Sequence, residues 1–124
     1  LAAGRIELMQ RLTELAGNPA IRRRTSDFVE SARNAIRDHM TPQDLSGALR
    51  DQLGMPVRRS GSGRAFDHIG EVQTTLSSLT DAKRALIGDL QRLDPSSEAF
   101  RTISREIEAM SEMRRRVLEF LEIR

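Results

Sequence analysis

Apolar residues recur with the period of an α-helix along almost the whole chain, and this pattern limits the fold more than any other sequence feature. Over residues 65–124 the apolar positions are spaced by alternating threes and fours, as on the buried stripe of a helix. The strict alternation of apolar and polar residues that indicates a β-strand is absent. The sequence therefore predicts an all-α fold.

Capping residues and glycines divide this pattern into segments. A first helix is expected over about residues 3–16, with Gly17 just past its end. Asn18 and Thr41 each precede a proline, which predicts that they cap two further helices, the second of them ending at Gly54. Residues 55–63 should then form a loop, since they include a proline and two glycines.

The C-terminal half predicts a long antiparallel helical hairpin, because Asp94-Pro95 interrupts the apolar stripe once. Each arm should run about 40 Å. A turn at this point would set His68 level with Leu121 and bring residues 114–116 near the open end of the hairpin. Lys83 and Arg114 fall on positions of the buried seam, and Arg114 is therefore expected either to emerge as a surface arginine or to bind substrate phosphate.

Length and composition exclude several classes of protein. A chain of 124 residues is enough for one domain with its own core, and the absence of cysteine excludes disulfide scaffolds and thiolate zinc sites. With only two histidines, we expect no bound metal and no other cofactor. No apolar run is long enough to cross a bilayer, and the amino terminus has no hydrophobic segment followed by a cleavage site. Any export is therefore expected to occur as a fragment of something larger or through a dedicated apparatus.

Arginine dominates the basic residues, which indicates an anionic partner. All 20 basic residues except Lys83 are arginine, whose planar fork suits phosphate and carboxylate groups. Residues 1–64 carry eleven arginines against seven acidic residues, and clusters occur at residues 22–24, 58–64 and 114–116. Each cluster could equally be a solvated face or loop.

The candidate reaction site is the segment in which Asp67, His68 and Glu71 begin a helix. The helix dipole there would favour the carboxylates and keep the imidazole neutral, so that His68 could act as a base oriented by one of them. The alternative is structural, with Asp67 capping the helix and His68 packing on the hairpin. His39 is expected to interact with the end of its own helix, or else to be the second imidazole of an acid–base pair.

Two segments resemble the polymorphic toxin type 28 domain. Residues 44–57 (DLSGALRDQLGMPV) and residues 66–72 (FDHIGEV) follow its pattern in order and spacing. The resemblance covers about residues 41–121 and therefore divides the chain into N-terminal helices over 1–40, packed on the core, and a toxin domain over 41–124. Gly70 departs from the family pattern and weakens the first helical turn.

The resemblance implies a ribonuclease that forms the C-terminal part of a secreted bacterial effector, as in contact-dependent growth inhibition. It implies action in the cytoplasm of a target bacterium and neutralisation by a cognate immunity protein. Some relatives cleave transfer RNA and require elongation factor Tu. By match to the family motif, the expected catalytic residues are His68, Asp67 and Glu71.

These considerations together predict a metal-independent RNA endonuclease. Its substrate supplies the 2′-OH nucleophile, so the protein needs a base, an acid and cationic groups for the phosphate. Arg58, Arg59 and Arg64 are the expected phosphate ligands, with Arg114 as a further one. The rival hypothesis is a non-enzymatic helical module that binds another protein, for which Asp67, His68 and Glu71 would be dispensable.

Overall fold

Five helices make up the fold, and the all-α prediction is confirmed. The computed structural model of the chain describes residues 1–122, and within them the only strand-like feature is an isolated bridge between Arg58 and Ala65. The helices are α1 (Ala2–Ala16), α2 (Arg23–His39), α3 (Pro42–Gln52), α4 (His68–Leu90) and α5 (Glu98–Leu121). None of these helices is both long and apolar enough to span a membrane.

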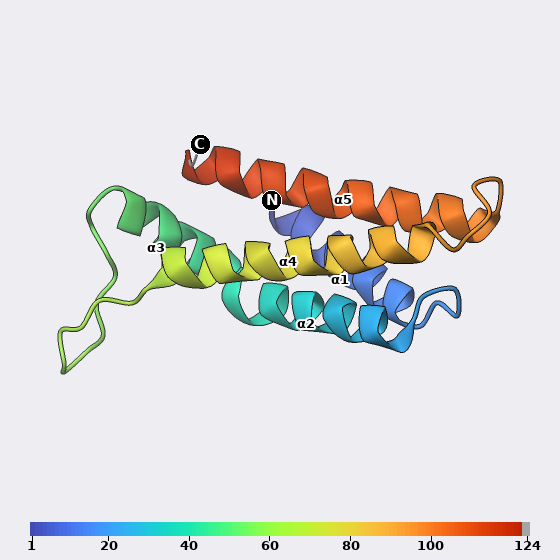
Figure 1. Cartoon of the computed structure of the whole chain (residues 1–124). Helices are drawn as coiled ribbons and strands as arrows, with labels where there is room; N and C mark the ends of the chain where they lie inside the picture. Colours follow the sequence, from blue (N-terminus) through green and yellow to red (C-terminus); the bar gives the residue numbers. More distant parts are fainter. Residues whose placement is uncertain (123–124) are drawn as a thin grey trace.

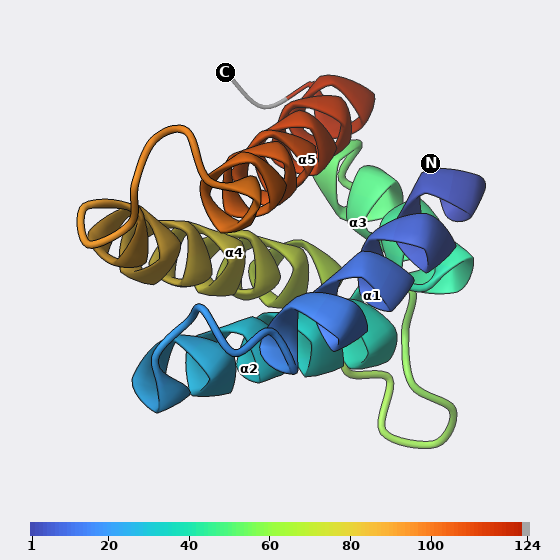
Figure 2. The ribbon, with the colours of Figure 1, turned by 90° about the vertical axis from the view of Figure 1, so that its right-hand side faces the viewer.

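Helix α4 lies at the centre of one face of the molecule. Figure 1 shows α4 and α5 running antiparallel, as predicted, with α2 along the other side of α4. Helix α1 lies behind α4 in this view and packs on α2 and α5, as the side view in Figure 2 shows. The short α3 packs on the first turns of α4 and reaches the C-terminal end of α5. The start of α4 therefore lies beside three other helices, α2, α3 and α5.

The helix boundaries confirm some of the predicted caps and correct others. Thr41 caps α3 in a complete capping box with Asp44, as its sequence indicated. Asn18 does not start α2, because its side chain accepts the N–H of Ala20 in a local turn and the helix begins only at Arg23. Likewise Ser97, not Asp94, caps α5.

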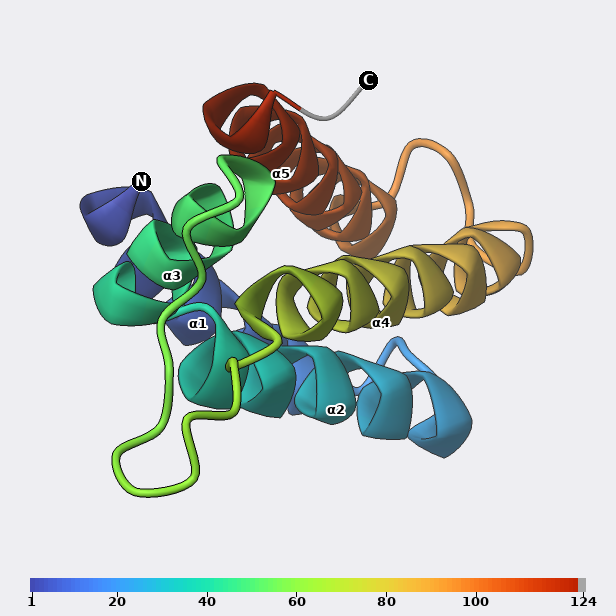
Figure 3. The ribbon, with the colours of Figure 1, turned by 90° about the vertical axis from the view of Figure 1, so that its left-hand side faces the viewer.

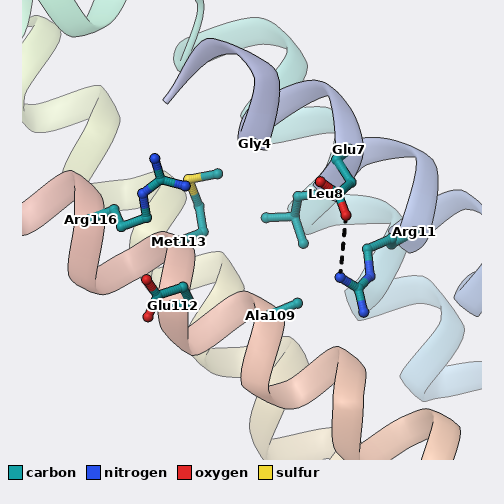
Figure 4. A pocket seen from close by; sticks show the side chains of 8 residues that line it. All are labelled: Gly4, Glu7, Leu8, Arg11, Ala109, Glu112, Met113 and Arg116. Atoms are coloured by element: carbon teal, nitrogen blue, oxygen red, sulfur yellow. Dashed lines mark ion pairs between the residues drawn. The ribbon is translucent and has the colours of Figure 1, made fainter.

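The buried faces of the hairpin arms follow most of the predicted seam and depart from it at Lys83 and Arg114. Ala82 and Met113 are buried, while Lys83 is partly exposed and Arg114 is exposed. The reason is that α5 packs on α1 as well as on α4, so its buried face turns toward α1. Figure 4 shows this junction, where Met113 lies close to Gly4. The core is one cluster with residues from all five helices, so residues 1–40 do not form a separate core.

A buried carboxylate joins the end of α4 to the start of α2. Asp89 is fully buried and accepts hydrogen bonds from the backbone N–H and guanidinium of Arg22 and, at 2.6 Å, from Arg92. Burial by itself raises the pKa of this carboxyl, whereas the neighbouring Thr25 hydroxyl and the two arginines lower it, and the net pKa lies below the ordinary value. The charged form of Asp89 therefore stabilises the fold.

Replacing Asp89 with asparagine is expected to lower the free energy of unfolding by about 1 to 3 kcal/mol at neutral pH. Because the folded-state pKa is depressed, the contribution of Asp89 is present above its unfolded value near 4 and is lost as the pH falls through the folded value. Urea unfolding at several pH values should show a smaller acid-induced loss in the variant. Asp81→Asn, an exposed change on the same helix, is the control.

Candidate active site

The candidate catalytic imidazole is held against α3. His68 is the first residue of α4, and its side chain is 15% exposed. Its ring lies so close to Gly47 that a Cβ built on this glycine would be 2.2 Å from the His68 Cδ2 atom. Only a glycine at position 47 leaves room for the ring. His68 therefore packs on α3, which also contacts the C-terminal end of α5.

A carboxylate on α3 faces this imidazole. The Oδ1 atom of Asp44 lies 3.6 Å from Nδ1 of His68. The other carboxylate oxygen of Asp44 accepts the backbone N–H and the hydroxyl of Thr41 at 3.1 and 2.8 Å, within the capping box of α3. The cap thus fixes the Asp44 side chain with one oxygen turned to the ring. The separation is longer than a hydrogen bond, and Nδ1 of His68 is buried without a hydrogen-bond partner among the described residues. A small turn of the ring would let Asp44 accept a hydrogen bond from Nδ1 and so orient the imidazole.

Asp44 and Gly47 were not predicted to be site residues. Both lie in the first of the two segments that resemble the toxin family. Their spacing of three places them on one face of α3, and this could have suggested that they contact a common partner. The identity of that partner depends on how α3 packs on α4.

Asp51 fastens the two elements together at this point. Its Oδ2 atom accepts the backbone N–H of Ile69 at 3.0 Å, so a side chain of α3 satisfies one of the free amide groups at the start of α4. The interaction holds the first turn of α4, including His68, beside α3.

Asp67 occupies the cap of α4. Its Oδ1 atom accepts the N–H of Gly70 at 3.0 Å, and a Cβ at position 70 would lie 2.3 Å from its other carboxylate oxygen. The glycine that departs from the family pattern therefore leaves space for this cap. Within residues 1–122 the structure shows no ion pair between Asp67 and either histidine. A catalytic role for Asp67 stays a prediction.

Glu71 lies between the two histidines of the chain. Its Oε2 atom is 3.4 Å from Nδ1 of His39, and both side chains are about half exposed. Glu71, His68 and Asp44 each offer a donor atom within 4.8 Å of the others. The end of α2 thus brings a second imidazole to the site. The sequence left this open as the alternative for His39, because the contact joins two helices far apart in the chain.

Asp44, His68 and Glu71 are the only group of side chains in the described residues that could hold a metal ion. They offer two carboxylates and one imidazole, a set that could bind a divalent cation together with water. Without any cation, the same groups can exchange protons. The chemistry of the donors permits both uses.

The loop between α3 and α4 places basic side chains beside His68. The ring of Phe66 stacks on the imidazole with 5.2 Å between centroids, and the Arg59 guanidinium lies 4.3 Å from the centre of the Phe66 ring. Figure 3 shows the loop projecting beyond the start of α4. Gly61 and Gly63 adopt φ values of +85° and +70°, as their sequence indicated.

Arg58, Arg59 and Arg64 all lie exposed in this loop. Arg58 donates to the carbonyl of Gly63, but within residues 1–122 none of the three arginines pairs with a carboxylate. Their charges therefore remain available to an anionic ligand. The loop brings these predicted phosphate ligands to the same end of the molecule as His68.

The arginines of α5 point in different directions. Arg114 lines a hollow together with Gln73 and Ser77 of α4. Arg115 pairs with Glu112 and Glu119 on its own helix, and Arg116 lies at the junction with α1. Only Arg114 of this run thus faces the exposed side of α4.

The chain is similar in sequence to a known family of proteins. The sequence model of the bacterial toxin 28 family matches residues 20–122, which include α2 and therefore His39. No curated protein and no solved structure matches the chain. The family match confirms the resemblance seen in the two motif segments and begins earlier in the chain than they do. Because it covers most of the sequence, the chain belongs to the bacterial toxin 28 family.

Proposed function

We propose that this toxin domain is a metal-independent RNA endonuclease. The observation that carries the proposal is the position of His68, held between Asp44 and the Gly47 backbone and within reach of Glu71. Arginines without carboxylate partners lie in the loop beside it. A base, a neighbouring acid–base group and free cations are the groups that cleavage of RNA by its own 2′-OH requires.

His68 is assigned as the base. Its Nδ1 atom faces Asp44, which leaves Nε2 to take the proton of the 2′-OH. The 2′-oxygen then bonds to phosphorus as the bond from phosphorus to the 5′-oxygen breaks. The products are a 2′,3′-cyclic phosphate and a 5′-hydroxyl end. Arg58, Arg59 and Arg64 would stabilise the charge that develops on the phosphate oxygens.

The second proton transfer is assigned to His39 acting with Glu71. The 5′-oxygen needs a proton as it leaves, and His39 in its protonated form can donate one. The Oε2 atom of Glu71 lies 3.4 Å from Nδ1 of His39 and can orient the imidazole toward the leaving oxygen. This arrangement completes the pair of proton-transfer groups that a single histidine could not supply.

The biological setting follows from the family. We infer that the domain reaches the cytoplasm of a target bacterium as the C-terminal part of a larger secreted effector, and that a cognate immunity protein neutralises it. Transfer RNA is the proposed substrate. A requirement for elongation factor Tu stays a prediction drawn from the resemblance alone.

The purified domain is expected to cleave RNA equally well with and without EDTA. Its products should carry 2′,3′-cyclic phosphate ends, and a 2′-deoxy nucleotide at the cleaved position should abolish cleavage there, because it removes the nucleophile. End-group analysis by mass spectrometry and gel assays of matched ribo and deoxy substrates test this. Inhibition by EDTA, reversed by Mg²⁺ or Mn²⁺, would replace the present mechanism with metal-assisted hydrolysis at Asp44, His68 and Glu71.

A further inference from the structure

The exposed face of α4 carries a continuous series of hollows. Its exposed residues Gln73, Ser77, Asp81 and Arg84 follow one another at helical spacing, so they share a single stripe. This stripe lies between α2 and α5, the two helices that flank α4 in Figure 1. Most side chains along this stripe are small or polar, so the surface of α4 is lower here than α2 and α5 on either side.

Three hollows meet along this stripe. The first contains His39 and Glu71 and reaches Gln73 and Ser77. A second shares these two residues and extends to Arg84 and Arg114. The third is lined in part by Asp81, Arg84, Arg24 and Phe28. Neighbouring hollows share residues and therefore adjoin one another along α4. Together they are here called the α4 trough, which leads away from the candidate active site.

Arginines from three helices line the distal part of the α4 trough. Arg24 comes from α2, Arg84 from α4 and Arg114 from α5, and within residues 1–122 none of them forms an ion pair. Asp81 is the one carboxylate that lines this part. Arg22 also reaches it, but its charge is matched by buried Asp89. The distal trough is therefore positively charged, whereas the proximal part holds the carboxylates of the reaction site.

We propose that the α4 trough binds the single-stranded RNA chain on one side of the cleaved bond. Arg114, Arg84 and Arg24 would contact successive phosphates there, while the arginines of the loop at the other end of α4 hold the other side of the substrate. The inference rests on the proposed function, since it takes the bond cleaved at His68 as its origin. It extends that function by assigning the surface that the RNA follows, along α4 and away from His68.

The dimensions and chemistry of the trough favour a single strand. From Glu71 to Arg84 it follows α4 for roughly 20 Å, which can accommodate several nucleotides. Apart from the His39 imidazole at the proximal end, Phe28 is the one aromatic side chain among the described residues that line it, and Arg24 lies 5.7 Å from the centre of that ring. Base stacking can therefore contribute little, and phosphate contacts should dominate. Binding in the trough is expected to tolerate many sequences and to weaken with salt.

The test is the double variant Arg84→Gln, Arg114→Gln in a His68→Ala background, which prevents cleavage during the measurement. Binding of a labelled single-stranded RNA oligonucleotide is followed by fluorescence anisotropy at several salt concentrations. The dissociation constant should rise about tenfold, and the slope of log K against log salt should fall by about 1 to 1.5, since each lost phosphate contact contributes about 0.7.

The matched control is Arg23→Gln, Arg105→Gln, which removes the same charge from exposed positions that line none of the three hollows. It should change the dissociation constant by less than about twofold. If both double variants weakened RNA binding equally, the effect would be one of net charge and the proposal would be wrong. Unchanged binding by the Arg84→Gln, Arg114→Gln variant would also overturn it.

This binding assay, combined with a cleavage assay of the wild type and of the Arg84→Gln, Arg114→Gln variant, separates this proposal from the proposed function. Trough-dependent RNA binding without any RNA cleavage by the wild type would remove the nuclease assignment and keep the track. RNA cleavage that is unchanged when Arg84 and Arg114 are replaced would keep the nuclease assignment and remove the track. A trough that binds an acidic protein but not RNA would also refute the track.

Discussion

Replacing His68 with alanine is expected to lower the rate of RNA cleavage by about 10²- to 10⁴-fold, the usual contribution of a positioned acid or base. The side chain is mostly buried against Gly47 and Phe66, so its removal also leaves a small void. A loss of about 1 to 2 kcal/mol in the free energy of unfolding should accompany the change. From the hairpin pattern alone, His68 would lie beside the buried seam, and its replacement by alanine would hardly change the free energy of unfolding.

The measurement compares single-turnover cleavage by the wild type, His68→Ala and His68→Gln. Glutamine fills most of the space of the imidazole but cannot take a proton near neutral pH, so its stability should lie nearer that of the wild type while its activity stays low. Circular dichroism confirms that each variant is folded. Full cleavage activity in either variant would remove His68 from the mechanism and assign the base to another group.

The pH dependence of the same reaction separates the two histidines. With a base and an acid in the mechanism, the wild type should show a bell-shaped profile. His39→Ala should lose the limb that reports the acid and retain that of the base. A role of His39 confined to packing would leave the shape of the profile unchanged.

Local sequence patterns predicted the parts of this fold that depend on neighbouring residues. The N-cap at Thr41 and the turn glycines of the loop between α3 and α4 were predicted because their chemistry is completed within a few residues. The Asn18 prediction failed for a related reason, since the same side chain can stabilise either a helix start or a local turn. The choice between them depends on packing with other helices.

The candidate site was only partly predictable because its geometry is tertiary. His68 and Glu71 share one helix and were found together, but the imidazole of His39 and the carboxylate of Asp44 come from two other helices. Arg114 shows the same limit on the hairpin. A two-helix seam would bury it, yet α5 also packs on α1, and Met113 becomes the buried residue.

Replacing Gly47 with alanine is expected to impair cleavage nearly as strongly as a change to the active site, by about 10²-fold, although residue 47 carries no reactive group. The added methyl group would lie 2.2 to 2.8 Å from three atoms of the His68 ring, closer than non-bonded atoms can approach. Either the ring must turn away from Asp44 or α3 must move from α4. Alanine favours helices by about 1 kcal/mol over glycine, so the local helix itself should not be weakened.

This combination distinguishes a misplaced imidazole from a damaged fold. Helical content should be retained, kcat should fall more than KM rises, and the perturbed signals in nuclear magnetic resonance should centre on His68. Gly17→Ala is the control, because a Cβ there meets its nearest neighbour, the Glu14 carbonyl, at an ordinary 3.6 Å. Unchanged activity in Gly47→Ala would show that the position of His68 against α3 does not matter for the reaction, and the Asp44–His68 pair would lose its proposed role.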